Sequence, residues 1–403
     1  MNLFKKQKDI SSADTFCMAP YLSLYVDTTN DVRPCCISKL EGIKYNSNES
    51  VIEFYNDQKM IDLRKDLSNG VKHASCNHCW NAEKVGMPSL RQGINERYED
   101  QFKKIRKDIT DDYNLEKLDI KYLDIRFNNK CNLKCRTCSP QFSSSWYSDH
   151  QKMYPKITIE KKLDSDVTLA SLEPILQTVT DIYFAGGEPL ITDQHYEVLQ
   201  WLIDNNRTNV NISYNTNFSK LTYKEHNVVD YWKKFKTVIV SASLDGSHEK
   251  GEYIRKNIDW HEVVKNRKIL MTDCPNVAFS ISCTLSILNA YNIVELHKEW
   301  VELGFIQPQD FTVNLLFGPD WYNIKNLPSN HKETLTALYT GHIDWLKTFK
   351  NCDGVIAGYE SAISLLKEPG NTGWIVRWSN VNDRLDKIRN ENFYEIFPEY
   401  KDL

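Results

Sequence analysis

Residues 121–140, KYLDIRFNNKCNLKCRTCSP, join a run typical of a β-strand to three cysteines at unequal spacing. The run is KYLDIRF, and Cys131, Cys135 and Cys138 follow it in the pattern C-x3-C-x2-C. Five more runs of the same kind alternate with amphipathic helical patterns such as that of residues 192–206. These runs are residues 180–187, 209–217, 236–246, 276–286 and 310–318. Alternation of strands and helices predicts parallel βαβ units.

The ends of these runs favour a partial barrel over a doubly wound sheet. Each run finishes in small or polar residues, and the carboxyl ends of parallel strands meet at one rim of a barrel. We therefore predict an α/β protein with a partial (β/α)6 TIM-like barrel over residues 113–330. A small cysteine-rich module is expected over residues 1–112, ending in a charged, solvated linking helix, and a helical extension over residues 331–403.

The composition excludes several classes of protein. The chain has 403 residues, more than a single core usually holds, and its net charge of −4 gives no general attraction for nucleic acid or an acidic membrane. No run of about 18 apolar residues and no signal-peptide pattern occurs, so we expect a cytoplasmic protein. In that reducing compartment, grouped cysteines favour metal ligation over disulfides. Cys274, Cys283 and Cys352 stand alone and are predicted to be buried thiols.

Three thiolates on one short loop suit two kinds of metal site. A catalytic zinc ion takes three protein ligands and keeps one open position. A cubane iron–sulfur cluster also accepts three cysteines, and its fourth iron then stays free to bind a small molecule. The loop from Cys131 to Cys138 is short enough to wrap three corners of a cube.

Four motifs together resemble those of the radical S-adenosylmethionine (radical SAM) enzymes, over roughly residues 118–330. They are CNLKCRTC (131–138), AGGEP (185–189), NTN (215–217) and SLDG (243–246). The resemblance implies that Cys131, Cys135 and Cys138 hold a [4Fe-4S] cluster whose free iron binds SAM. In that family an electron from the cluster cleaves SAM to methionine and a 5'-deoxyadenosyl radical, which abstracts hydrogen from a substrate. The cofactor carries this chemistry, and the protein supplies position and excludes water.

The AGGEP motif fits the needs of such a cosubstrate. Gly186 and Gly187 allow the backbone to come close to a ligand at a strand end, although a Gly-Gly pair is also an ordinary turn. The Glu188 carboxylate is a suitable acceptor for the methionine ammonium group of SAM.

Family analogy also assigns residues at later strand ends to SAM. Asn217 and Ser243 are expected near the ribose or carboxylate, and Arg255 near the methionine carboxylate. Asp245 is expected either to cap the following helix or to face the substrate. Many family members carry an aromatic residue just before the third cysteine, where it packs on adenine, whereas this chain has Thr137 at that position.

A second group of cysteines precedes the barrel. Its members are Cys17, Cys35, Cys36, Cys76 and Cys79. One interpretation is a zinc site, because His73 and His78 flank the last pair, and such a site serves folding or contacts with nucleic acid.

The interpretation we favour is an auxiliary [4Fe-4S] cluster, in a module that resembles the SPASM and twitch modules of radical SAM maturases. The expected ligands are Cys17, Cys35, Cys76 and Cys79. Cys36 is the neighbour that could replace Cys35. Asn30 stands where the pattern of those modules has a glycine, and the modules usually follow the barrel instead of preceding it.

The sequence therefore predicts a radical SAM enzyme that modifies a peptide or protein with the help of an auxiliary cluster. We expect a reducing partner such as flavodoxin or ferredoxin. We do not expect the protein to bind nucleic acid or a membrane. Oxidation or rearrangement of a carbohydrate, nucleoside or aminoglycoside is the alternative within the same class. A zinc-containing nucleic-acid-binding protein on a degenerate barrel is the alternative of another class.

Overall fold

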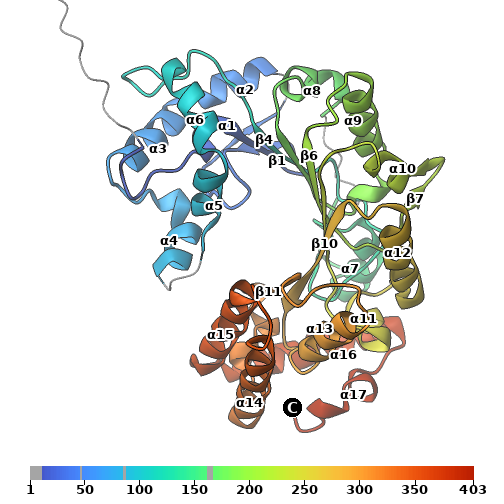
Figure 1. The fold of residues 1–403 in the computed structure, drawn as a ribbon. Coiled ribbons are helices and arrows are strands. Elements are labelled where there is room, and N and C mark those ends of the chain that lie inside the picture. The colour runs from blue at the N-terminus through green and yellow to red at the C-terminus, as the bar shows by residue number, and fades with distance from the viewer. Residues whose placement is uncertain (1–10, 46–47, 85–87, 161–166) are drawn as a thin grey trace, which may run out of the picture. The chain divides into compact units, whose positions relative to one another are not determined.

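A computed structural model describes residues 11–45, 48–84, 88–160 and 167–403 (Figure 1). Its contacts divide the chain into two compact units. Unit 1 comprises Met1–Asn128, Asp164–Gly186 and Asp193–Ile212, and unit 2 comprises Asn129–Leu163, Gly187–Thr192 and Ser213–Leu403. The three-domain division predicted from the sequence, with boundaries at residues 112 and 330, stays a prediction.

The strands of unit 1 lie in the order β5-β4-β1-β2-β3. They are β1 (Ser23–Val26), β2 (Asp31–Arg33), β3 (Ile43–Lys44), β4 (Tyr122–Ile125) and β5 (Asp181–Phe184). Strand β4 pairs in parallel with both β1 and β5, whereas β2 pairs antiparallel with β1 and β3. Strand β1 was not expected, because its run YLSLYV lies within the cysteine-rich segment and was interpreted only as part of that module.

The helices of unit 1 come from all three of its chain segments. They are α1 (Ala19–Leu22), α2 (Asn48–Tyr55), α3 (Gln58–Ser68), α4 (Asn77–Lys84), α5 (Leu90–Arg97), α6 (Glu99–Ile105), α8 (Leu169–Leu176) and α9 (Asp193–Asp204). Helices α8 and α9 lie side by side (Figure 1). Leu123 and Ile125 of β4, with Ile182 and Phe184 of β5, have no exposed surface and belong to the apolar core.

The strands of unit 2 lie in the order β11-β10-β9-β6. They are β6 (Asn211–Thr216), whose first two residues belong to unit 1, β9 (Val238–Ala242), β10 (Val277–Leu285) and β11 (Phe311–Leu315). Strand β10 pairs in parallel with β9 and β11. A separate hairpin is formed by β7 (Thr222–Tyr223) and β8 (His226–Asn227).

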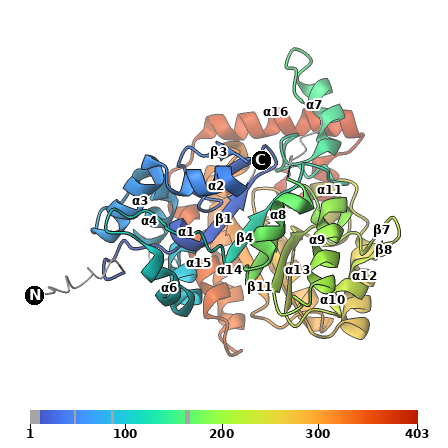
Figure 2. The same ribbon diagram turned by 90° about the horizontal axis from the view of Figure 1, so that it is seen from above.

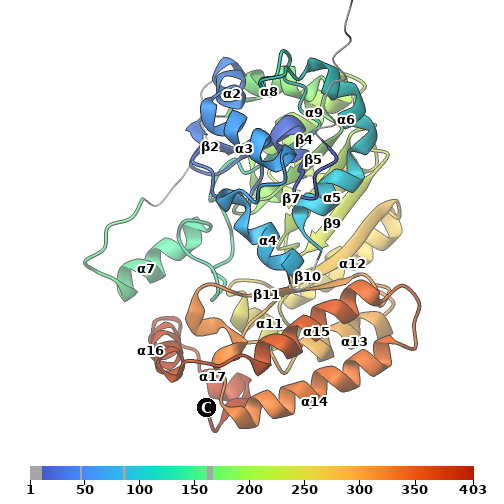
Figure 3. The ribbon, with the colours of Figure 1, turned by 90° about the vertical axis from the view of Figure 1, so that its left-hand side faces the viewer.

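The helices of unit 2 include a large carboxy-terminal group. They are α7 (Tyr147–Met153), α10 (Val228–Trp232), α11 (His248–Ile254), α12 (Trp260–Asp273), α13 (Ile293–Glu302), α14 (Ser329–Leu346), α15 (Asp353–Lys367), α16 (Thr372–Arg389) and α17 (Phe393–Ile396). Helices α14 and α15 run side by side (Figure 3), and α16 lies along α7 (Figure 2). Within the described ranges, every helix is too short or too polar to cross a bilayer.

The α/β class and the strand–helix order of a partial (β/α)6 barrel are confirmed, because each of the six predicted runs contains a strand. Cys274, Cys283 and Cys352 are buried, as predicted. The prediction of one solvated linking helix is wrong. Helices α5 and α6 are separate, with Ile94 and Phe102 buried, because the chain leaves helical geometry at Tyr98, whose hydroxyl donates to Asp181 Oδ2 at 2.8 Å.

Candidate functional site

The three cysteines of the C-x3-C-x2-C motif lie on one loop of unit 2, which follows β4 in the chain. The Cys138 amide donates to Cys135 O at 3.0 Å, and the Leu133 amide lies 3.5 Å from Cys131 Sγ, so the loop folds around its own thiols. Trp146 Nε1 donates to Cys135 O at 2.7 Å and anchors the loop to the start of α7. These local bonds hold the three thiols on a single compact turn.

Burial raises the pKa of all three thiols, that of Cys138 to about 12. The nearby Cys135 raises the pKa values of Cys131 and Cys138 further, because like charges placed close together disfavour ionisation. A bound metal centre would compensate the thiolate charges, since metal binding displaces the thiol protons. The donor set therefore fits a thiolate-ligated metal group.

Glu188 is buried, and three hydrogen-bond donors of unit 2 hold its carboxylate. Its Oε1 accepts from Thr216 Oγ1 at 2.6 Å and from the Leu190 amide at 3.1 Å, and its Oε2 accepts from the Asn217 amide at 2.7 Å. Burial raises the pKa of Glu188 to about 7, although these three bonds oppose the shift. A cationic group placed beside Glu188 would restore its charge.

Asn217 joins Glu188 to the cysteine loop. While its amide N–H binds Glu188, its Nδ2 donates to Asn132 Oδ1 at 3.0 Å and lies 3.8 Å from Cys131 Sγ. Its Oδ1 accepts from Ser219 Oγ at 2.7 Å. The structure thus brings the NTN motif, Glu188 and the first cysteine together, as the sequence predicted. The Asn217 side chain itself contacts only protein groups among the described residues.

Gly187 lies against the backbone that leads into the cysteine loop. A Cβ added at Gly187 would be 2.2 Å from Lys130 O, so no larger residue fits without moving the chain. The Glu188 amide donates to the same Lys130 O at 2.7 Å. Gly186, in unit 1, has a φ of +119°, which L side chains rarely adopt. Glycine is therefore required at position 187 by the close approach of the Lys130 backbone, and at position 186 by the positive φ angle.

Arg255 faces the second cysteine. Its Nη2 pairs with Asp245 Oδ2 at 2.8 Å, its Nη1 lies 3.7 Å from Cys135 Sγ, and its Nε has no hydrogen-bond partner among the described residues. Asp245 Oδ1 also accepts from the Thr284 amide at 2.8 Å, so Asp245 neither caps a helix nor stands free to face a substrate. Ser243, expected near SAM, donates its amide to Thr216 O at 2.7 Å.

One support of the cysteine loop could not be expected from the motif. Arg136, between the second and third cysteines, is completely buried and donates to Asp386 Oδ1 at 2.5 Å and Glu391 Oε2 at 2.6 Å. Its Nη1 donates to Asn382 Oδ1 at 2.8 Å, and its guanidinium carbon lies 3.6 Å from the centre of the Tyr253 ring. Helix α16 and the residues after it thus hold the loop at its centre.

Helix α16 also supplies an arginine, Arg389, that reaches the same loop. Arg389 donates from Nη2 to Lys134 O at 2.9 Å and from Nε to Asp149 Oδ2 at 2.9 Å, and it packs over the Trp146 ring. The only sequence signal for this contact was the pair of basic residues in the last turn of α16, which is common in surface helices.

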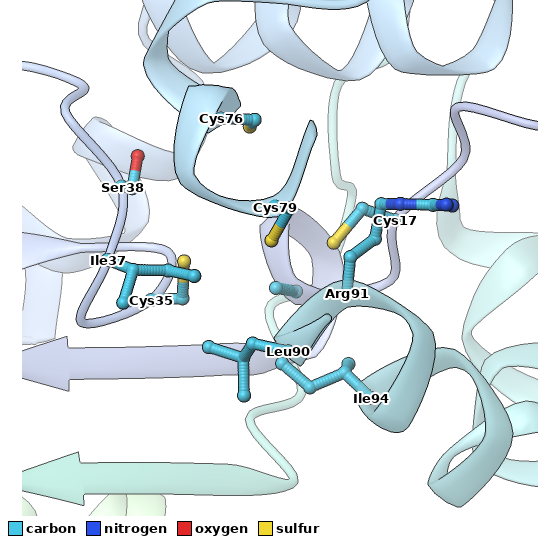
Figure 4. Close-up of a pocket in the computed structure, with 10 residues that line it drawn as sticks. Cys17, Cys35, Ile37, Ser38, Cys76, Cys79, Leu90, Arg91 and Ile94 are labelled. Atoms are coloured by element: carbon cyan, nitrogen blue, oxygen red, sulfur yellow. The ribbon is translucent and has the colours of Figure 1, made fainter. Parts of the chain in front are cut away.

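The second group of cysteines lies within unit 1 and is brought together at one small pocket (Figure 4). Among the residues lining it are Cys17, Cys35, Cys76 and Cys79, the four predicted ligands. Cys17 lies just before α1, Cys35 comes from the loop after β2, and Cys79 is on α4. Asn30 has a φ of +66°, which explains why an asparagine can stand where the related pattern has glycine.

Cys36 does not line this pocket and lies beside Asp124. Burial raises the pKa of the Cys36 thiol, and the nearby Asp124 carboxylate raises that pKa further. His73 binds Ser75 through Nδ1 at 2.8 Å and does not line the pocket, and neither does His78. Among the described residues, no three His, Cys, Asp or Glu side chains converge as they would around one metal ion. A cubane differs from a single ion because each ligand binds a different iron.

No protein-family model matches the sequence, and no curated protein matches it. Several solved structures do. Native anSMEcpe with bound AdoMet and the peptide Cp18Cys matches with 18% identity and a TM-score of 0.40, over 56% of this chain and 60% of that chain. Histidine-tagged anSMEcpe with bound AdoMet matches with 19% identity and a TM-score of 0.40 over the same shares.

TYW1 with a lysine–pyruvate adduct bound matches with 12% identity and a TM-score of 0.29, over 55% of this chain and 70% of that chain. The protein anSMEcpe is an anaerobic sulfatase-maturating enzyme of the radical SAM class. This chain spans about three fifths of its length.

Proposed function

We propose that the protein is a radical SAM enzyme that modifies a peptide or protein. One observation carries the proposal: Asn217 binds Glu188 with its amide N–H and approaches Cys131 Sγ with its side chain. An acceptor for the SAM ammonium group and a set of three thiols therefore lie at neighbouring positions of unit 2, from motifs that are far apart in sequence.

Each residue has a distinct part in this proposal. Cys131, Cys135 and Cys138 would hold a [4Fe-4S] cluster, and Glu188 would accept from the SAM ammonium group. Arg255, paired with Asp245, would place positive charge beside Cys135 and the cluster, near the SAM carboxylate. When bound, the cluster would supply the electron that cleaves SAM and so starts hydrogen abstraction from the substrate.

The cysteines of unit 1 support an auxiliary [4Fe-4S] cluster. Cys17, Cys35, Cys76 and Cys79 line one pocket, with apolar residues and Arg91 around them, and this surrounding suits a desolvated, thiolate-bound group. The proposed cellular setting is the cytoplasm, with a flavodoxin or ferredoxin as electron donor.

Anaerobic reconstitution tests the proposal. We expect about eight irons and eight sulfides per chain, and release of 5'-deoxyadenosine from SAM after reduction with dithionite. Cys135→Ala should abolish that release. Cys274→Ala is the matched control, because Cys274 is a buried thiol that belongs to neither group. Zinc without iron, or equal release by both variants, would overturn the proposal.

A further inference from the structure

The two faces of strands β9, β10 and β11 in unit 2 differ in character. On one face the side chains are apolar and buried, for example Ile281 of β10 and Val313 of β11. Helix α15 packs on this face, because a Cβ added at its Gly358 would lie 3.1 Å from Val313 Cβ. Successive side chains of a strand point to opposite faces, so the residues between the buried ones lie on the second face.

This second face, the open face, is polar and uncharged. Its members are Ile239, Ser241, Ala278, Ser280, Ser282, Thr284, Thr312 and Asn314. Ser282 and Thr284 of β10 are in register with Thr312 and Asn314 of β11, and residues in register project to the same face. All members except the isoleucine and the alanine carry a hydroxyl or an amide, and no member is charged or aromatic.

Solvent reaches the open face. Thr312 and Asn314 are exposed, and the hydroxyl residues of β10 are half-buried. Neighbours on the face contact each other: Asn314 Nδ2 donates to Ser282 Oγ at 2.9 Å, and the hydroxyls of Ser241 and Ser280 are 3.2 Å apart. A hydroxyl has one donor and two acceptor sites, so these contacts leave capacity for a ligand.

A polar face of this kind is unusual on parallel strands. Parallel strands in α/β proteins are usually apolar on both faces, and the inner positions of a barrel are filled mainly by bulky branched side chains. Small hydroxyl residues in their place give up apolar burial. Such departures from the pattern of a stable core are expected at functional sites.

The open face leads to the cysteine loop. Thr284 is its member nearest the carboxyl end of β10, and the Thr284 amide donates to Asp245 Oδ1 at 2.8 Å. Asp245 pairs in turn with Arg255, whose Nη1 lies 3.7 Å from Cys135 Sγ. A ligand lying along the open face would therefore have one end near the proposed cluster.

We propose that the open face binds the main chain of an extended, uncharged segment of a peptide substrate. Alternate side chains of a strand are about 6.6 Å apart, and alternate peptide groups of an extended ligand have the same repeat. The hydroxyls of Ser280, Ser282 and Thr284 therefore match every second peptide group of such a ligand, as donors or acceptors.

The same face disfavours other ligands. A carboxylate or ammonium group placed on it would lose hydration without gaining an opposite charge. A nucleic acid strand would need cationic side chains for its phosphates and aromatic rings for its bases. The inference rests on the proposed function and names the class of peptide that this site accepts.

The test measures binding to the reconstituted full chain by ligand-observed NMR. The probes are the peptide acetyl-Gly-Thr-Gly-Thr-Gly-Thr-Gly-amide, its counterpart with aspartate in place of threonine, and maltotriose. One variant removes three hydroxyls of the open face by Ser280→Ala, Ser282→Ala and Thr312→Val. The matched control removes three exposed hydroxyls of α14 and α15 by Thr340→Val, Ser361→Ala and Ser364→Ala.

We expect the threonine peptide to bind wild type and the control equally, and the variant at least about tenfold more weakly. The aspartate peptide should bind wild type at least about tenfold more weakly than the threonine peptide. Equal binding of the threonine peptide to the variant, stronger binding of maltotriose, or no binding of the threonine peptide to wild type would overturn the inference.

A gain of binding distinguishes direct contact from damage to the fold. Thr312→Lys adds a cation at an exposed position of the open face, so it should bind the aspartate peptide at least about threefold more tightly than wild type does. Thr340→Lys adds the same charge on α14 and should bind this peptide as wild type does. The same affinity in both lysine variants would overturn the inference.

Two measurements on wild type separate this inference from the proposed function. Wild type that holds iron and releases 5'-deoxyadenosine, but binds the two peptides equally, would end the inference and leave the proposed function standing. Wild type that holds no iron or releases nothing would end the proposed function, whereas the peptide affinities would still decide what the open face binds.

Discussion

Replacing Gly187 with alanine tests whether the cysteine loop depends on close packing of the backbone. The new Cβ would lie 2.2 Å from Lys130 O and 2.6 Å from Lys130 C, and both are backbone atoms that cannot rotate away. Ordinary contact requires a movement of about 1 Å, which would also break the bond from the Glu188 amide to Lys130 O. Overpacking of this kind costs about 1–3 kcal/mol, and the lost hydrogen bond adds about 1 kcal/mol.

We therefore expect Gly187→Ala to lose about 2–4 kcal/mol locally, at the residues that lead into Cys131. The assay is iron content after anaerobic reconstitution, together with the thermal midpoint. Gly341→Ala is the matched control: it lies within α14, nothing is within 4 Å of its added Cβ, and alanine there should stabilise the helix by about 0.5–1 kcal/mol. Equal iron content and equal thermal midpoints in the two variants would refute the reasoning.

Three further predictions address other parts of the molecule. Arg136→Met leaves Asp386 and Glu391 buried without their cation, so we expect the free energy of unfolding to fall by about 3–5 kcal/mol and the cysteine loop to lose iron. The control Arg377→Met, at an exposed position of α16, should change neither the stability nor the iron content. Burial lowers the pKa of His297 to about 4 and that of His342 to about 3. Because the unfolded chain binds more protons below about pH 6.5, stability should fall by about 2 kcal/mol per histidine from pH 7 to pH 5; a thermal midpoint independent of pH there would contradict the assignment. Cys35→Ala should lower the iron content from about eight to about four, whereas Cys36→Ala should leave it unchanged. Equal iron loss in the two cysteine variants would mean that Cys36 is also a ligand.

The strands could be predicted because their signal is local. Apolar runs such as residues 276–286 end in small or polar residues, and each formed a strand where the pattern placed it. The run that became β1 was missed because its partner in the sheet, β4, lies far away in sequence. The break at Tyr98 was missed for the same reason, since the tyrosine binds Asp181, which no periodicity within residues 89–112 reveals.

The site shows the same division between local and distant signals. Cysteine spacing located the thiols, and the AGGEP and NTN motifs located Glu188 and Asn217. The sequence left Cys35 and Cys36 as alternatives, and only the fold shows that Cys35 lines the pocket while Cys36 faces Asp124. Arg136 looked like an ordinary spacer in CNLKCRTC, because its partners on and after α16 lie about 250 residues away.

The electron paramagnetic resonance spectrum of the reduced, reconstituted protein tests the central claim most directly. If SAM binds the free iron of a cluster held by Cys131, Cys135 and Cys138, adding SAM should change the g values of wild type, and Cys135→Ala should lack that SAM-sensitive signal. A cluster spectrum that stays the same with and without SAM would contradict the account.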